Sequence, residues 1–160
     1  AAGARPGGPA AGALAARTSN VRRSWRYPLW FAVAVSAAQL VPYGRAHDNP
    51  PAAREPEWDS AATRDLARRA CFDCHSNQTR WPWYAHVAPV SWLLQRDVHE
   101  GRSVLNFTEF EREQPKAALA ADEVRARAMP PWFYLPMHSE ARLSDRERLA
   151  LVEGLQNTLK

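Results

Sequence analysis

The hydrophobic and polar positions of this chain follow helical spacing along most of its length. Residues 88–101 carry apolar side chains three or four positions apart, with Pro89 near the start and Gly101 at the end, which predicts an amphipathic helix. Residues 115–128 are rich in alanine and charged residues and predict a further helix that stops before Pro130. No stretch alternates apolar and polar residues as a half-buried strand does. The pattern therefore predicts an all-α fold.

Capping signals indicate where other helices begin. Asp59 or Ser60 can cap a helix that continues through Ala70. Thr108 and Glu111 have the spacing of a capping box, which predicts a helix start there.

A closing helix is predicted at the C-terminal end of the chain. Ser144 and Glu147 form its capping box. Its apolar stripe is expected to consist of Leu149, Val152, Leu155 and Leu159.

Three segments precede the expected helical domain, which is placed at residues 59–160. Residues 1–24 hold almost only small, polar and basic residues and predict a disordered basic lead. Residues 25–43 join a basic flank to an apolar run with aromatic edges, a pattern typical of a membrane anchor or a secretory signal. Residues 44–58 contain three prolines and predict an extended linker.

The length of the apolar run bears on the choice between anchor and signal. A helix from Trp25 to Tyr43 spans about 28 Å, close to the hydrocarbon thickness of a bilayer. The strictly apolar part is nearer the length of a signal h-region, and residues 36–38 or 44–46 offer small-residue cleavage sites. We favour an uncleaved N-terminal transmembrane helix, with a cleaved signal as the alternative.

The positive charge of the chain is confined to its N-terminal region. Residues 1–44 hold five arginines and no acidic residue, whereas residues 45–160 hold 16 Lys and Arg against 17 Asp and Glu, a net charge of −1. Because the folded part has no concentrated basic face, we expect no nucleic-acid binding. By the positive-inside rule, the arginines instead predict that the rest of the chain lies outside the cytoplasm.

Both cysteines of the chain lie in one five-residue motif, Cys71-Phe72-Asp73-Cys74-His75. In an exported protein, C-x-x-C-H is the attachment pattern of a c-type haem. Residues three apart share one helical face, so Cys71 and Cys74 can reach the two vinyl groups at one porphyrin edge. The imidazole of His75 then provides a ligand to the iron. The motif predicts one covalently attached haem c.

Zinc binding, thiol redox chemistry and a plain disulfide are the competing interpretations of this motif. A zinc site needs two further ligands, and His86, His99 and His138 form no second pair at finger-like spacing. A thioredoxin-like redox pair requires a βαβ context, which the pattern around residue 71 does not provide. Haem is the favoured interpretation.

The loop after the motif supplies three large aromatic side chains, Trp81, Trp83 and Tyr84. Such side chains bury a large apolar area, so we expect them to pack on the porphyrin face or edge. Packing that only closes the protein core is the alternative.

Two methionines are candidates for the sixth iron ligand, Met129 and Met137. Met129 precedes two prolines at a helix end and is favoured. The alternatives are Met137, a histidine (His138, His99 or His86), an open site, or a purely packing role for both methionines.

Six short motifs carry a family resemblance: Cys-Phe-Asp-Cys-His-Ser-Asn, Arg-Trp-Pro-Trp-Tyr, Ala-Pro-Val-Ser-Trp, Glu-Gly-Arg, Leu-Asn-Phe-Thr-Glu-Phe and Met-Pro-Pro-Trp. In this order, over residues 49–155, they resemble the haem-binding domain family of bacterial cytochrome c-like proteins. The resemblance implies a small cytochrome c-like helical domain with one haem, on the periplasmic or extracellular side of the cytoplasmic membrane and often behind an N-terminal anchor. It also aligns Met129 with the family's Met-Pro motif.

Two redox-active or ligand-sensing functions fit such a domain, and a haem-binding or structural module without redox function is a third interpretation. With His75 and Met129 both on the iron, no coordination position is free, so the protein is an electron carrier for an unidentified redox partner. A haem sensor or a small peroxidase-like enzyme needs an open or displaceable distal site. The sequence contains no recognisable distal acid and base pair, which favours the carrier over an enzyme.

Overall fold

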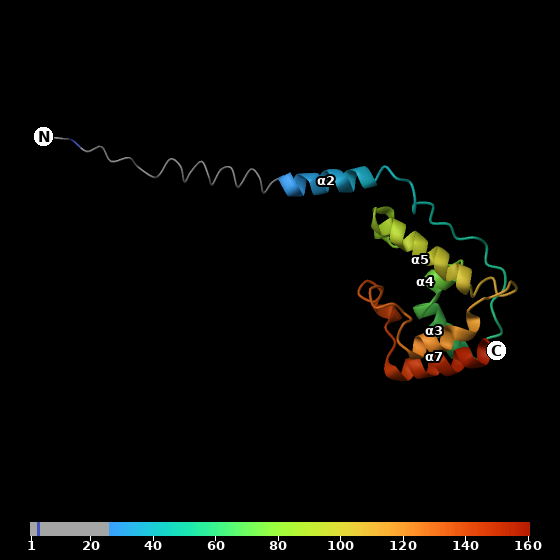
Figure 1. Cartoon of the computed structure of the whole chain (residues 1–160). Coiled ribbons are helices and arrows are strands. Elements are labelled where there is room, and N and C mark those ends of the chain that lie inside the picture. Colours follow the sequence, from blue (N-terminus) through green and yellow to red (C-terminus); the bar gives the residue numbers. More distant parts are fainter. Residues whose placement is uncertain (1–2, 4–25) are drawn as a thin grey trace. The chain divides into compact units, whose positions relative to one another are not determined.

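The computed structural model describes residue 3 and residues 26–160 and divides the chain into Ala1–Pro42 and a compact unit, Tyr43–Lys160. All regular elements of the described residues are helical, which confirms the all-α prediction (Figure 1). The lead expected at residues 1–24 lies outside the described residues except for Gly3.

The first unit contains α2 (Arg26–Ala38), a helix of 13 residues. It is shorter than the helix expected from Trp25 to Tyr43, of which Trp25 is not among the described residues. Large apolar side chains of α2, such as Tyr27 and Trp30, are exposed. Within the part of the chain that the structure describes, no helix combines the length and the apolar character needed to cross a membrane.

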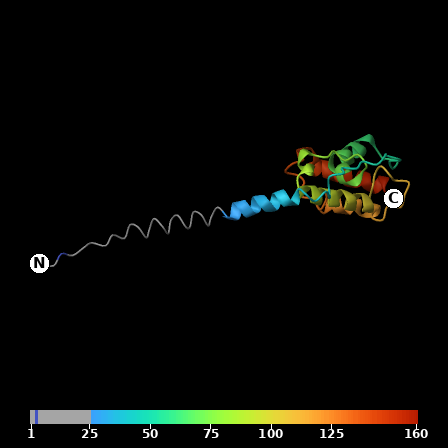
Figure 2. The same cartoon turned by 90° about the horizontal axis from the view of Figure 1, so that it is seen from above.

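The compact unit is a set of short helices joined by ordered loops (Figures 1 and 2). The α-helices are α3 (Ala61–Ala70), α4 (Phe72–His75), α5 (Val90–Val104), α6 (Ala120–Arg125) and α7 (Asp145–Thr158), and single-turn 3-10 helices are η1 (Trp83–His86), η2 (Ala117–Leu119) and η3 (Ser139–Ala141). Helix α7 packs against α3 and α6, while α4 packs against α3 and α5. Helix α4, which carries most of the cysteine motif, therefore contacts both α3 and α5.

Local capping chemistry explains where α3 and α7 begin. The Ser60 side chain accepts a hydrogen bond from the Thr63 backbone N–H at 3.1 Å. Ser144 and Glu147 form the predicted capping box, with the Ser144 backbone N–H donating to Glu147 Oε2 at 2.8 Å. These bonds satisfy N–H groups that have no partner inside the helix, which confirms both predicted starts.

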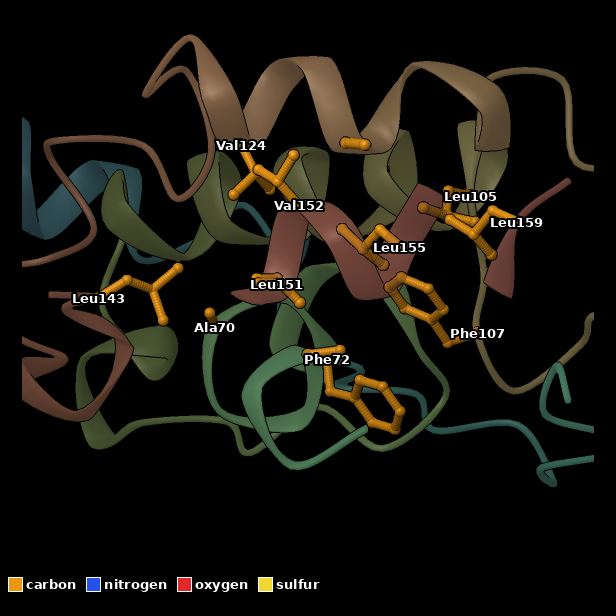
Figure 3. Packing of buried hydrophobic residues seen from close by; sticks show 12 residues of the cluster. Ala70, Phe72, Leu105, Phe107, Val124, Leu143, Leu151, Val152, Leu155 and Leu159 are labelled. Atoms are coloured by element: carbon orange, nitrogen blue, oxygen red, sulfur yellow. The ribbon is translucent and has the colours of Figure 1, made fainter. Parts of the chain in front are cut away.

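The core lies where α3, α4, α6 and α7 meet the loop that follows α5, and Figure 3 shows its side chains converging. Its buried members are Ala67, Ala70, Phe72, Leu105, Phe107, Ala121, Val124, Leu143, Leu151, Val152, Leu155 and Leu159. The apolar stripe of α7 differs from the prediction in one residue, because Leu149 is 68% exposed and Leu151 is fully buried. At 3.6 residues per turn, Leu151, Leu155 and Val152 fall within an arc of about 100°, whereas Leu149 lies outside that arc, about 60° beyond Val152 at its edge.

Two helix predictions for the segment after α5 were wrong. The helix expected at 115–128 is reduced to η2 and α6, which ends at Arg125 because Arg127 takes a positive φ of 61°. No helix starts at Thr108; its buried hydroxyl donates to Asn106 Oδ1 at 2.9 Å and accepts from the Asn77 backbone N–H at 2.8 Å. The hydroxyl that a capping box requires is thus used in a tertiary contact.

Residues 44–58, here called the strap, contain no helix or strand and belong to the compact unit. Arg102 of α5 holds the strap by donating to the Asp48 carbonyl and to Asn49 Oδ1, both at 2.8 Å. Two backbone hydrogen bonds, Ala53 N–H to Thr108 carbonyl and Phe110 N–H to Arg54 carbonyl, continue this attachment. The strap is therefore attached to the domain by hydrogen bonds and is part of its structure.

Candidate haem site

His75 is oriented by the backbone of α5. Its Nδ1 lies 3.1 Å from the carbonyl oxygens of Gly101 and Leu105. Since both partners are acceptors, Nδ1 carries the proton and Nε2 keeps its lone pair. Burial lowers the pKa of His75, although these two hydrogen bonds act in the opposite direction. A neutral imidazole with a fixed tautomer is the form that ligates a metal.

Gly101 permits this approach of α5 to the motif. A Cβ atom at this position would lie 2.4 Å from the carbonyl oxygen of Cys74. Gly101 was predicted to end its helix, but α5 continues to Val104. The glycine is needed for the close contact of two backbones, a role that the local sequence does not reveal.

Cys71 is the residue between α3 and α4, and Cys74 lies within α4. Cys71 ends α3 and precedes α4, and the Cys74 N–H donates to the Cys71 carbonyl at 3.2 Å. Both cysteines are free, and burial raises the pKa of each thiol to about 12. In the residues that the structure covers, no three His, Cys, Asp or Glu side chains gather as a metal-binding group.

Two cavities of about 480 and 260 Å³ border the motif. Five residues line both of them: Ala70, Cys71, His75, Val104 and Met129. Cys74 lines the larger cavity. Together the two volumes fall within the range of about 300–1,000 Å³ that is usual for ligand and cofactor sites. The structure thus brings both cysteines, the histidine and one methionine to a space of cofactor size.

A helix end delivers Met129 to these cavities. The N–H groups of Arg127 and Ala128 donate to the carbonyls of Val124 and Glu123, the pattern of a Schellman cap, with Arg127 in the left-handed region. The Met129 N–H also donates to the Glu123 carbonyl, at 3.2 Å. The chain therefore leaves α6 with Met129 directed to the core, against which its side chain packs.

The alternative ligands lie outside the cavity linings. Met137 is 62% exposed and His99 is exposed as well. His86 contacts the ring of His47, with 4.4 Å between centroids. The His138 ring stacks on the Tyr134 ring, with 3.7 Å between the ring centroids.

The three aromatic residues expected on the porphyrin are not among the residues that line the two cavities. Trp83 is 74% exposed, and Trp81 stacks on His47 with 4.7 Å between ring centroids. The Tyr84 hydroxyl lies 3.3 Å from His138 Nε2.

Sequence reasoning assigned no role to Asp73, the second residue between the cysteines. Asp73 is 9% exposed and accepts hydrogen bonds from the Arg80 backbone and guanidinium and, at 2.6 Å, from the Tyr134 hydroxyl. Burial alone raises the pKa of Asp73, but the hydrogen bonds from Arg80 and Tyr134 outweigh it, so its pKa lies below the usual value. Tyr134 lines the larger cavity. A buried, ionised carboxylate therefore connects the motif to the loop after Met129.

Comparison with known proteins places the chain in a family. A family model described as a haem-binding domain matches residues 33–157. The chain belongs to this family. No curated protein and no solved structure matches the chain significantly.

Membership of the haem-binding domain family confirms the resemblance seen in the sequence and identifies the chain as a haem protein. The residues at the cavities fit that cofactor. They provide a neutral imidazole held through Nδ1, two free thiols three residues apart, and walls formed largely by apolar side chains.

Proposed function

We propose that this protein is a monohaem electron carrier of the c type. Cys71 and Cys74 would hold the haem covalently through their sulfur atoms, and His75 and Met129 would bind its iron. Electron transfer then requires donor and acceptor proteins as redox partners.

The observation that carries this proposal is the arrangement of His75 and Met129. Two backbone carbonyls fix the His75 imidazole through Nδ1, and Met129 lines both cavities with His75. When bound, the haem supplies reversible one-electron chemistry at its iron. The chain's own residues orient the imidazole, bring the thioether to the same space and surround it with apolar side chains. A neutral thioether favours ferrous iron, which suits a carrier.

A haem-based sensor or small peroxidase-like enzyme is the alternative function. It requires an iron position that is open or from which Met129 is readily displaced. Absorption spectra of the ferric and ferrous protein, with and without carbon monoxide, separate the two functions. We expect a low-spin haem that binds carbon monoxide slowly and incompletely; rapid, complete binding supports the alternative.

Covalent attachment is tested on the full chain produced with a c-type maturation system. We expect the denatured protein to retain one haem by mass spectrometry and the Cys71→Ala, Cys74→Ala double variant to lose it on denaturation. Purified wild-type protein that carries zinc or an intramolecular disulfide in place of haem contradicts the proposal.

We further propose that residues 25–43 attach the chain to the bacterial cytoplasmic membrane, with the haem domain on the periplasmic or extracellular side. The arginine flank, the exposed apolar side chains of α2 and the extracytoplasmic assembly implied for this family support this placement. We expect the protein in the membrane fraction and the domain open to protease in spheroplasts. A mature N-terminus near residue 39 or 47 would show that the segment is a cleaved signal and not an anchor. A domain that is protected from protease contradicts the proposal.

A further inference from the structure

The loop from Met129 to Glu140 is fixed to the rest of the domain at several points, one of which is the contact between the His138 ring and the Tyr84 hydroxyl, 3.3 Å apart. At its start, the Met129 N–H donates to the Glu123 carbonyl, and Arg148 donates to the Met129 carbonyl at 3.4 Å. In its middle, the Tyr134 hydroxyl donates to Asp73 Oδ2 at 2.6 Å. At its end, the Glu140 carboxylate lies 3.4 Å from Arg80 Nη2.

The middle attachment is the one that reaches the cysteine motif itself. Asp73 stands between Cys71 and Cys74. Its carboxylate is held in place independently of the loop, because Oδ1 accepts from the Arg80 backbone N–H at 3.1 Å and from Arg80 Nε at 3.2 Å. A hydrogen bond to Asp73 therefore fixes a distant part of the chain relative to the thiols.

The Tyr134 ring, whose hydroxyl makes this hydrogen bond to Asp73, is itself held in place. It is half-buried, lines the larger cavity together with Met129 and His75, and stacks on His138 with planes inclined by 8°. His138 Nδ1 in turn lies 3.0 Å from the Tyr134 carbonyl. The ring is thus held on one side by stacking and at its tip by a carboxylate.

We propose that Tyr134 is a positioning residue that keeps Met129 on the haem iron by joining its loop to Asp73. The inference rests on the proposed ligation by Met129. A hydrogen bond from a hydroxyl to a carboxylate is among the stronger ones in proteins, and it restricts the loop before the ligand has to bind. Without it, more conformational entropy is lost each time the thioether returns to the iron, which weakens the bond.

The test compares Tyr134→Phe with wild-type full-chain haem protein. This variant removes one oxygen atom and keeps the ring. We expect about a tenfold rise in the fraction of ferrous haem open to carbon monoxide, the factor that corresponds to ~1.4 kcal/mol. We also expect a lower reduction potential, a weaker far-red band of the ferric protein, and faster hydrogen exchange at the amides of residues 132–135 and 137.

Three further variants complete the experiment. Asp73→Asn, which weakens the acceptor, should move the same quantities in the same direction. Tyr43→Phe, which removes the same oxygen atom from a side chain that is 52% exposed, should change none of them. Met129→Ala gives the absorption spectrum and reduction potential of the haem when the thioether ligand is absent.

The outcomes separate this inference from the proposed function. If Met129→Ala leaves the spectrum and potential unchanged, the ligation by Met129 is wrong and the inference falls with it. If Met129→Ala changes them but Tyr134→Phe does not, the inference alone is overturned. A Tyr134→Phe protein with altered potential but unchanged exchange in the loop also contradicts a positioning role.

Discussion

Gly101, inside α5, lies against the backbone of Cys74 so closely that a Cβ atom would be 2.4 Å from the Cys74 carbonyl oxygen. The carbonyl of the same glycine is one of the two acceptors for His75 Nδ1. One residue without a side chain therefore sets both the distance between α5 and the motif and the orientation of the proposed iron ligand.

Replacing Gly101 by Ala should disturb both features, because the two atoms nearest to the new methyl group are the carbonyl oxygen and carbon of Cys74, which cannot move aside as a flexible side chain does. We expect a loss of about 1–3 kcal/mol in the free energy of unfolding, the usual cost of overpacking. We also expect less haem per protein and an altered spectrum. Urea denaturation and the ratio of haem to protein absorbance measure these effects.

Gly154→Ala is the matched control for Gly101→Ala. Gly154 also lies inside a helix, and a Cβ there would be 2.1 Å from Thr63 Oγ1. We expect this variant to lower stability but to keep the spectrum of the haem that it binds. An equal spectral change in both variants contradicts a specific role for Gly101.

Met129→Ala should give the spectrum of a haem without its thioether ligand. We expect loss of the weak far-red band, a lower reduction potential and rapid carbon monoxide binding, because a neutral soft ligand stabilises ferrous iron. Met137→Ala should change none of these, since Met137 is 62% exposed and lines neither cavity. If the two variants exchange these phenotypes, Met137 is the ligand.

Arg102→Ala should loosen the strap. The Arg102 guanidinium donates to four oxygens: the carbonyls of Ser76 and Asp48, Asn49 Oδ1 and Thr79 Oγ1. We expect about 2–3 kcal/mol less stability, in line with the loss of hydrogen bonds made by a charged group. Limited proteolysis should also cleave residues 44–58 faster.

The control for this change is Arg96→Ala. Arg96 belongs to the same helix, but its ion pair with Glu100 is exposed on both sides, and exposed pairs contribute about 0–1 kcal/mol. Equal proteolysis of the strap in both variants is inconsistent with the role given to Arg102.

The acid stability of the strap should depend on Glu55. Hydrogen bonds from Arg64, at 2.6 and 2.7 Å, lower the pKa of Glu55; burial opposes this, and Trp58 and the charge of Arg68 assist it. A folded-state pKa below the unfolded value gives stability that is present above the unfolded value, about 4.3, and is lost as the pH falls through the folded value. We expect Glu55→Gln to cost about 1 kcal/mol or less at pH 7 and progressively less below pH 4.

Thermal unfolding between pH 7 and pH 3 measures this dependence. Glu57→Gln is the control, because the Glu57 side chain is 92% exposed and its contact with Arg54 is 3.4 Å long. A stability difference between wild type and Glu55→Gln that grows toward low pH contradicts the expected direction.

Features that depend on residues close together in the chain were predicted well. The helix starts at Ser60 and Ser144 follow from side chains that bond to N–H groups three residues away. The cysteine motif places both thiols and the imidazole within one turn of helix. The helical spacing also predicted the all-α class and most of the buried face of α7, with Leu149 taken for Leu151.

Features that depend on contacts between distant parts of the chain were missed or assigned otherwise. Gly101 was taken for a helix end because a glycine in a sequence does not reveal which backbone approaches it. Thr108 was taken for a cap because its hydrogen bond to Asn77 spans 31 residues. The link from Asp73 to Tyr134 spans 61 residues and had no signal in the local pattern.

The sequence by itself therefore determined the chemistry of this protein: two thiols and a histidine at the spacing of a haem attachment motif, and two candidate methionines. Tertiary structure decided which methionine lines the cavities, which nitrogen of His75 carries the proton, and that the strap belongs to the domain. The physical reason is that local hydrogen bonds need only neighbouring residues, whereas a cavity and its orienting contacts exist only after helices far apart in the chain have packed together.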